Sequence, residues 1–271
     1  MKKIILIALI LIAGIAPVIF FRGKQAVKKQ ELVCRIDLKS SQENLLKYLK
    51  LRKDVLAKEE IKKILSVERD DVCALWAKAE ILRRDYKFKE SEKLLKEVLG
   101  KYPGYAPALI SSAYIKYRYN KFQEAARLLK EALKQPDLER ENQALIYTLM
   151  ATINAKRAAQ GWLLSKVAYG TRIKGYFEKA KSIAPDLPEV RLGLGSFYLL
   201  APKIAGGGDV DRAVEELEWA VKLAPDFATA NARLAQAYKL KGNMEKYNFY
   251  IKKAKELDPG NEALKEIESR L

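Results

Sequence analysis

The chain has 271 residues, of which 49% are hydrophobic, and a formal net charge of +17 at pH 7. It contains no histidine, the commonest general base and metal ligand, so most hydrolase, metalloenzyme and pH-switch functions are disfavoured. Its two cysteines, Cys34 and Cys73, have neither a zinc-ligand nor a Cys-x-x-Cys spacing, although a disulfide between them is an alternative to two separate thiols. We therefore expect a non-enzymatic protein with one folded unit and no cofactor.

Residues 1–24 are predicted to be a membrane segment. Met1-Lys2-Lys3 precedes an uninterrupted apolar run from Ile4 to Phe21, which is long enough to span a bilayer core. Its Ile, Leu, Val and Phe side chains favour insertion by about 4–8 kcal/mol. We expect a single-pass anchor in the cell membrane. The alternative is a cleaved signal peptide, although Pro17 would directly follow the best small-residue cleavage site.

The positive charge is concentrated near this segment. Residues 1–53 hold 12 Lys and Arg against 3 Asp and Glu, a pattern that suits anionic lipid head groups better than a nucleic acid bound along the whole chain. Residues 25–39 are expected to be a basic linker. The positive charges after the apolar run favour a cytoplasmic location for the rest of the chain. The very short charged start is typical of an export signal, and we expect the extracytoplasmic side of the cell envelope.

From Ser40 onward the pattern becomes helical. Leu45 and Leu49, and later Ile61 and Ile64, recur at helical spacing and predict a degenerate leading helix pair. Between residues 72 and 137, and again near the C-terminus, the chain repeats itself every 34 residues. Such a period is typical of stacked helix-turn-helix units that bury their apolar faces against one another. The recurring pairs are Ala79 and Ala113, Ser91 and Ala125, Leu95 and Leu129, and Pro225 and Pro259.

The residues at these positions resemble the tetratricopeptide repeat. The fourth unit has Leu194-Gly195, Tyr198, Ala213, Leu217, Ala220 and Pro225, and the fifth has Leu234-Ala235, Tyr238, Ile251, Ala254 and Pro259. This resemblance implies an all-α, right-handed superhelical solenoid of about five hairpins, with a concave groove that holds a peptide or a partner helix. Residues 40–271 would form the solenoid, with repeats near 72–105, 106–139, 140–187, 188–227 and 228–261 and a capping helix at 262–271.

Two units are longer than the period and are expected to carry insertions, which often hold functional residues. The third unit has ten extra residues around Trp162, and the fourth has six extra residues in a stretch with Pro202, Gly206, Gly207 and Gly208. A phosphate-binding loop is disfavoured there, because no Lys-Ser/Thr pair follows and Asp209 is suited to cap the next helix. The break in the fourth unit resembles envelope-associated repeat proteins such as the T component of TRAP-type solute transporters.

In the tetratricopeptide family the groove is lined by the second, fifth, ninth and twelfth positions of each first helix. The family's carboxylate-binding Lys and Asn are replaced here by Trp76 and Glu80, so the resemblance implies an aromatic and aliphatic strip with arginines at its margin, and no carboxylate clamp. The alternative is that these aromatic residues only pack between helices. The implied partner-binding residues are Trp76, Glu80, Arg83, Ile110, Tyr114, Tyr117 and Arg118. Further implied positions are Cys73, Pro107, Leu145, Thr148, Thr152, Ala155, Leu192, Ser196, Leu199, Ala232, Gln236 and Lys239.

Our main hypothesis is a membrane-tethered scaffold that binds a protein or peptide partner. The alternative is an accessory subunit for solute uptake that holds a small organic ligand between the two insertions. Nucleic-acid binding is not expected, because no basic stripe follows the implied groove. The adjacent carboxylates of Glu59-Glu60 and Glu215-Glu216 diverge on a helix and are predicted to lie on solvated faces, so they form no acid-base pair.

Overall fold

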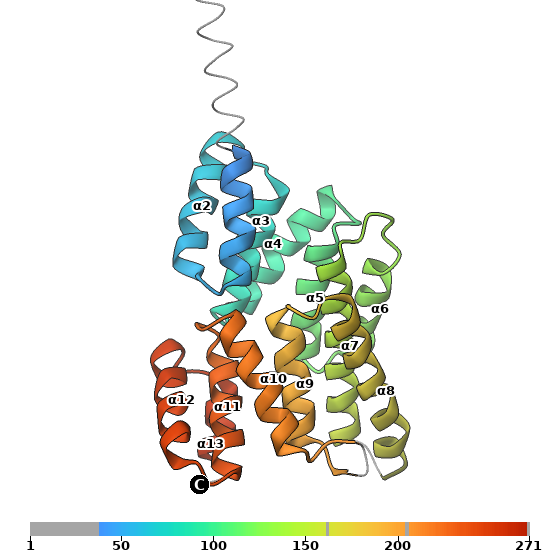
Figure 1. Cartoon of the computed structure of the whole chain (residues 1–271). Helices are drawn as coiled ribbons and strands as arrows, with labels where there is room; N and C mark the ends of the chain where they lie inside the picture. Colours follow the sequence, from blue (N-terminus) through green and yellow to red (C-terminus); the bar gives the residue numbers. More distant parts are fainter. Residues whose placement is uncertain (1–37, 161–162, 204–205, 270–271) are drawn as a thin grey trace, which may run out of the picture.

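The computed structural model describes residues 38–160, 163–203 and 206–269. All regular secondary structure in these ranges is helical, so the expected all-α class is confirmed. The first helix covers residues 38–50. It is followed by α2 (Asp54–Val67), α3 (Val72–Arg84), α4 (Phe88–Lys101), α5 (Ala106–Arg118), α6 (Phe122–Ala132), α7 (Arg140–Gln160), α8 (Leu163–Ile183), α9 (Pro188–Leu200), α10 (Val210–Leu223), α11 (Ala228–Leu240), α12 (Met244–Leu257) and α13 (Glu262–Glu268), as Figure 1 shows.

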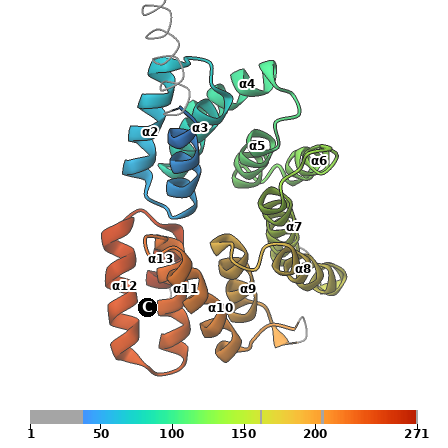
Figure 2. The ribbon, with the colours of Figure 1, turned by 45° about the horizontal axis from the view of Figure 1, so that its top comes forward.

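Successive helices pack as five hairpins, from α3 with α4 to α11 with α12. The first helices of neighbouring hairpins also pack on one another, α3 on α5, α5 on α7, α7 on α9 and α9 on α11. Figure 2 shows that the stack curves until α12 and α13 lie next to the start of α2 and the end of α3. The fold is therefore a helical repeat superhelix, as the sequence period predicts.

The period of 34 is also visible in the turns between paired helices. Arg52, Tyr86 and Asn120 have positive φ angles of 61°, 60° and 58°, and Gly242 has 74° in the last hairpin. Glycine adopts this left-handed conformation without strain, whereas other residues do so at a cost. Because Arg52 stands 34 residues before Tyr86, the leading helix pair has the same turn as the repeats that follow it.

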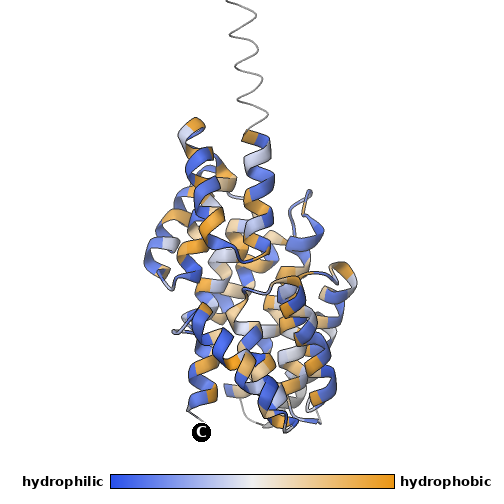
Figure 3. Ribbon diagram, turned by 60° about the vertical axis from the view of Figure 1, so that its left-hand side comes forward, coloured by the Kyte–Doolittle hydropathy of each residue, from blue (hydrophilic) through white to orange (hydrophobic). Residues whose placement is uncertain are grey.

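Small residues bring the two helices of each hairpin close together. Ala79 and Ala113 are fully buried, and the Ser91 hydroxyl donates a hydrogen bond to the Ala79 carbonyl at 2.7 Å. At Gly195, an added Cβ would lie 2.5 Å from Cγ of Leu217. Figure 3 shows hydrophobic and hydrophilic positions alternating around the helices, as expected when one face of each helix packs against its neighbours.

Side chains cap the helices at both ends of the repeat array. The Asp71 carboxylate accepts a hydrogen bond from the backbone N–H of Ala74 at 2.7 Å and caps α3. Asn261 caps α13 in the same way. Leu264 and Ile267 are buried, so α13 covers the apolar end of the last repeat.

The insertion of the third unit lengthens a hairpin instead of forming a loop. Helices α7 and α8 have 21 residues each, whereas the first helices of the other hairpins have 13. The extra residues continue the helical hydrogen bonding of α7 and α8. Trp162, expected in this insertion, lies outside the described residues.

Two carboxylates that were expected on solvated faces are buried, so this expectation is wrong for them. Glu216 is 4% exposed and pairs with Arg191 at 2.8 Å and Lys181 at 2.5 Å. Glu60 is 6% exposed. Adjacent residues diverge by about 100° around a helix, so one member of each pair points inward while its neighbour, such as Glu215, stays exposed.

Within the described ranges, no helix combines the length and the apolar composition needed to cross a membrane. The predicted span from Ile4 to Phe21 lies outside these ranges, as do most of the linker and Cys34, so the membrane anchor remains a prediction.

The close helix approach at Gly195 generates a test. Gly195→Ala should lower the free energy of unfolding by about 1–3 kcal/mol, because the new methyl group meets Leu217 and the Ala213 carbonyl oxygen 3.2 Å away. Gly100→Ala in α4, where nothing lies within 4 Å, should be neutral or stabilise by up to about 1 kcal/mol. Urea unfolding followed by circular dichroism measures both, and equal effects of the two substitutions would contradict this packing.

Candidate partner-binding groove

The concave side of the superhelix holds a groove with a volume of about 2140 Å³. Its floor is formed by the first helices α3, α5, α7 and α9, and one end is bounded by the turn of the leading helix pair. The first turn of α11 and the start of α13 bound the other end. The groove therefore runs through most of the repeat units.

The structure brings the implied partner-binding residues together along this groove. Trp76, Glu80 and Arg83 from α3 lie beside Ile110, Tyr114, Tyr117 and Arg118 from α5. The implied positions of the third unit, and Leu192 and Ser196 of the fourth, also line it. Their role in binding a partner stays a prediction.

The implied positions of the last units do not line the groove. Leu199 and Ala232 are buried in hydrophobic clusters, and Gln236 and Lys239 are not among the lining residues, although Gln236 accepts a hydrogen bond from the lining residue Arg233 at 2.8 Å. The strong curvature of the stack is the reason, because it turns the first turn of α11, with Arg233, toward the groove.

Aromatic side chains form much of the floor. The Trp76 and Tyr105 rings meet edge to face with centroids 6.3 Å apart, and the Tyr114 and Tyr117 rings are 5.8 Å apart. The Arg83 guanidinium lies 4.0 Å over the Tyr114 ring. These rings are partly buried, so they pack between helices and also leave surface for a partner.

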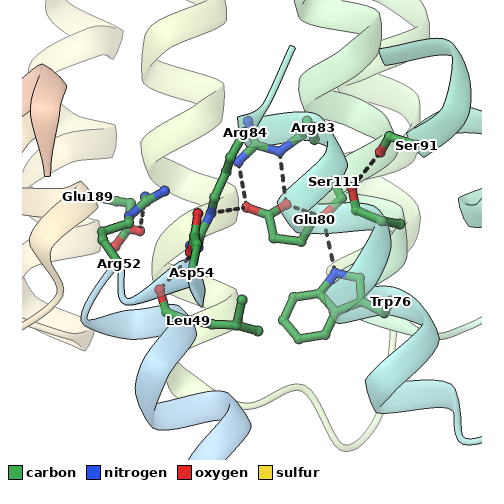
Figure 4. Close-up of polar contacts among 11 residues, drawn as sticks. Leu49, Arg52, Asp54, Trp76, Glu80, Arg83, Arg84, Ser91, Ser111 and Glu189 are labelled. Atoms are coloured by element: carbon green, nitrogen blue, oxygen red, sulfur yellow. Dashed lines mark hydrogen bonds and ion pairs between the residues drawn. The ribbon is translucent and has the colours of Figure 1, made fainter. Parts of the chain in front are cut away.

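A buried ionic network centred on Glu80 holds the floor in place (Figure 4). Its carboxylate accepts hydrogen bonds from Arg83 at 2.5 and 2.8 Å and from Arg84 at 3.1 Å. It also accepts one from the Ser111 hydroxyl at 2.9 Å, and Ser111 in turn accepts one from the Trp76 indole at 3.1 Å. The network therefore fixes the orientation of Trp76.

The arginines keep Glu80 ionised. Burial alone would raise its pKa, but the attraction and hydrogen bonds of Arg83, with further attraction from Arg84 and Arg52, hold the pKa well below its usual range. Sequence reasoning placed Glu80 on the groove surface and missed this network. The Glu-x-x-Arg-Arg spacing on one helix could have indicated it.

The two ends of the curved stack meet through side chains that we call the clasp. Arg52, at the turn before α2, pairs with Glu189 in the first turn of α9 at 2.5 Å. Its guanidinium also lies 4.1 Å over the Phe227 ring. The other clasp contacts are a 2.8 Å hydrogen bond from the Tyr86 hydroxyl to Asp258 and a two-pronged ion pair between Arg118 and Glu262.

The clasp is polar, whereas the stack is apolar. Among the described residues, none of the hydrophobic clusters joins the first two repeats to the last two. The Arg52 and Glu189 side chains are only 13% and 22% exposed, so the cost of desolvating their charges offsets much of their attraction, and the clasp is weaker than the helix packing it closes. Arg52 also occupies a strained left-handed conformation, which the clasp contacts help to offset.

No protein-family model matches the sequence, and no curated protein matches it. Several solved structures do match. TTC0263, a thermophilic TPR protein of Thermus thermophilus, is 18% identical with a TM-score of 0.58, over 73% of this chain and 97% of that one. Human IFIT1, solved as a dimer with m7Gppp-AAAA, is 19% identical with a TM-score of 0.59, over 82% of this chain and 50% of that one. PilF of Pseudomonas aeruginosa is 17% identical with a TM-score of 0.46, and the match covers 88% of this chain and 99% of that one.

The chain has the tetratricopeptide-repeat fold. The identities are too low to carry more than the fold, but the architecture agrees with the period, the small residues and the turns described above. The residues that the resemblance places on the inner face of this fold in the first three units are those found along the groove.

The break in the fourth repeat forms a turn beside α8. Pro202 lines the groove, whereas Gly206 and Gly208 have positive φ angles of 81° and 69°. An added Cβ at Gly206 would lie 3.6 Å from the Lys174 side chain, and one at Gly207 would lie 2.4 Å from the Ala201 carbonyl oxygen. Asp209 caps α10 as expected. The structure therefore brings the second insertion against the hairpin that carries the first.

Cys73 lines the groove but is poorly suited to nucleophilic chemistry. Burial, with Asp71 nearby, raises the pKa of its thiol to about 12, so it is almost fully protonated at neutral pH. In the described part of the chain, no group of three or more potential ligands could hold a metal ion.

The Glu80 network predicts a large effect of a nearly isosteric change. Glu80→Gln should lower the free energy of unfolding by about 3–5 kcal/mol, because it leaves buried arginines without their counter-charge. A depressed folded pKa means that this stabilisation is fully present above the pKa of the unfolded carboxyl and is lost only as pH falls through the folded value. The effect should therefore be the same at pH 7 and pH 6 in urea unfolding. Glu97→Gln on the exposed face of α4 is the control, with an expected change within about 0.5 kcal/mol; a similar result for both would refute the network.

The clasp is tested by replacing its strained residue. Arg52→Gly, combined with Tyr86→Phe and Arg118→Gln to remove the other clasp contacts, suits the left-handed turn at residue 52, so the hairpin should stay folded while the two ends of the stack move apart. Asn120→Gly, at the equivalent turn of the second repeat, is the matched control. Spin labels at exposed Lys89 and Lys252, in a background without Cys34 and Cys73, should report a longer distance for the triple variant and no change for Asn120→Gly. The same distance in both variants would argue against a clasp.

Proposed function

We propose that the protein is a non-enzymatic scaffold that binds a protein partner in its groove. The observation that carries this proposal is the groove itself, whose volume of about 2140 Å³ exceeds the roughly 300–1,000 Å³ of small-molecule pockets. Its aromatic and aliphatic floor suits an extended or helical segment of another protein. The repeat fold shared with TTC0263 supports an interaction role.

The chemistry of the groove supports binding over catalysis. Two arginines keep Glu80 ionised, and because they occupy its carboxylate oxygens, Glu80 is poorly placed to accept a proton from a substrate as a general base. Cys73 is protonated at neutral pH, and the chain has no histidine to activate it.

We further propose that residues 4–21 hold the scaffold at a cell membrane with the repeats on the extracytoplasmic side. The support is the uncharged apolar run and its short charged start. A membrane-impermeant thiol reagent tests the orientation. An engineered exposed cysteine that is labelled only after permeabilisation would refute export.

A second candidate function is an accessory role in solute uptake, with a small organic ligand held near the two insertions. The position of Gly206 close to Lys174 favours it, since Lys174 lies on α8, the helix that follows the first insertion. A small organic acid that raises the melting temperature would support this candidate, because a ligand of the folded state must stabilise it.

The groove assignment is tested by photo-crosslinking in native membranes. A benzophenone amino acid in place of Tyr114, in the groove, should capture a protein partner. The same substitution at Tyr102, which is 46% exposed and outside the groove, is the matched control and should capture none. Adding Trp76→Ala should reduce capture about tenfold or more, because aromatic anchors dominate such interfaces. Equal capture from both tyrosine positions would remove the groove assignment.

A further inference from the structure

The groove has the opposite charge balance to the whole chain. Nine Lys and Arg side chains and eleven Asp and Glu side chains line it, a net charge of −2, although the chain carries +17. The basic excess of the protein therefore lies outside the groove. The electrostatic potential in the groove therefore attracts cationic ligands more than the potential at the outer surface does.

Ion pairs between these side chains disfavour anionic ligands more than the net charge of the groove suggests. Most of its cations, including Arg52, Arg83 and Arg118, are already held by carboxylates of the network and the clasp. Among the described residues that line the groove, only Lys53 and Lys156 lack an ion pair on the cationic side. An anionic ligand would have to displace existing pairs.

Three carboxylates without a cationic partner lie along one edge of the groove. Asp137 and Glu139 precede α7, and Asp226 precedes α11, so they stand on the turns that lead into first helices of the stack. All three are exposed. We call this edge the acidic rim. The aromatic floor with Trp76 and Tyr114 lies within the same groove.

We propose that the groove binds a cationic amphipathic segment of a partner protein, with apolar side chains on the aromatic floor and Lys or Arg side chains toward the acidic rim. This inference rests on the proposed function and specifies the chemistry of its partner. The physical basis is charge complementarity at the rim, which steers binding and suppresses acidic competitors, and apolar burial at the floor, which supplies affinity.

Two synthetic helical peptides of about five turns test the proposal. They share one Leu and Trp face and differ only in having Lys or Glu on the other face. The full-length chain in nonionic detergent should bind the Lys peptide about tenfold more tightly at low salt, and added salt should narrow the difference. Because the chain has a net charge of +17, non-specific attraction would favour the Glu peptide, so a preference for the Lys peptide requires a local acidic surface such as the rim of the groove.

Charge reversal locates the preference. The double variant Asp137→Lys with Glu139→Lys should reduce or invert the preference for the Lys peptide. The double variant Glu97→Lys with Glu215→Lys makes the same charge change on exposed outer faces and should leave the preference unchanged. Equal binding or a preference for the Glu peptide would overturn the inference. If both peptides bind equally and Trp76→Ala abolishes the binding of both, the charge preference is refuted but the proposed role of the groove is not. Tighter binding of the chain's own basic residues 22–37, supplied as a peptide, would also overturn it, because the occupant would then be the chain itself.

Discussion

The structure depends on the close approach of the two helices in each hairpin. Fully buried small residues such as Ala79, Ala113 and Gly195 allow it, because a larger side chain at these points would meet the backbone or side chains of the facing helix. Tightly paired helices present their remaining apolar faces to the next hairpin, and the small rotation between neighbours accumulates into a superhelix. The concave groove is a consequence of this repeated packing.

Two kinds of interaction with different strengths shape the molecule. Along the stack, neighbouring hairpins bury apolar side chains, and these contacts are not weakened by the electrostatic screening of salt. Across the groove, the ends meet through Arg52, Tyr86 and Arg118 and their acidic or aromatic partners. The cost of desolvating these charged groups offsets much of their attraction, so each contact adds little net stability. The stack is therefore the permanent part of the structure, and the clasp is the part that a partner can most easily compete with.

The groove combines a rigid floor with a selective edge. The buried Glu80 network orients Trp76 through Ser111, so an aromatic anchor is presented in one conformation before any partner arrives. The internal ion pairs use most of the groove's cations and leave the carboxylates of the rim without a cationic partner. A basic protein thus has a groove with a small negative charge excess, because its positive excess lies on other faces.

The sequence by itself determined the helical class, the period, the cap at Asp209, and the inner positions of the first three repeats, because these follow from local spacing and short-range packing. It did not show that α7 and α8 absorb the third insertion as extra turns, nor that Glu216 is buried. Above all, the curvature of the stack decided that Arg52 reaches Glu189 and that Leu199 and Ala232 are buried away from the groove. Each unit adds only a small rotation, and contacts between residues more than a hundred positions apart depend on the sum of these rotations, which no single repeat encodes.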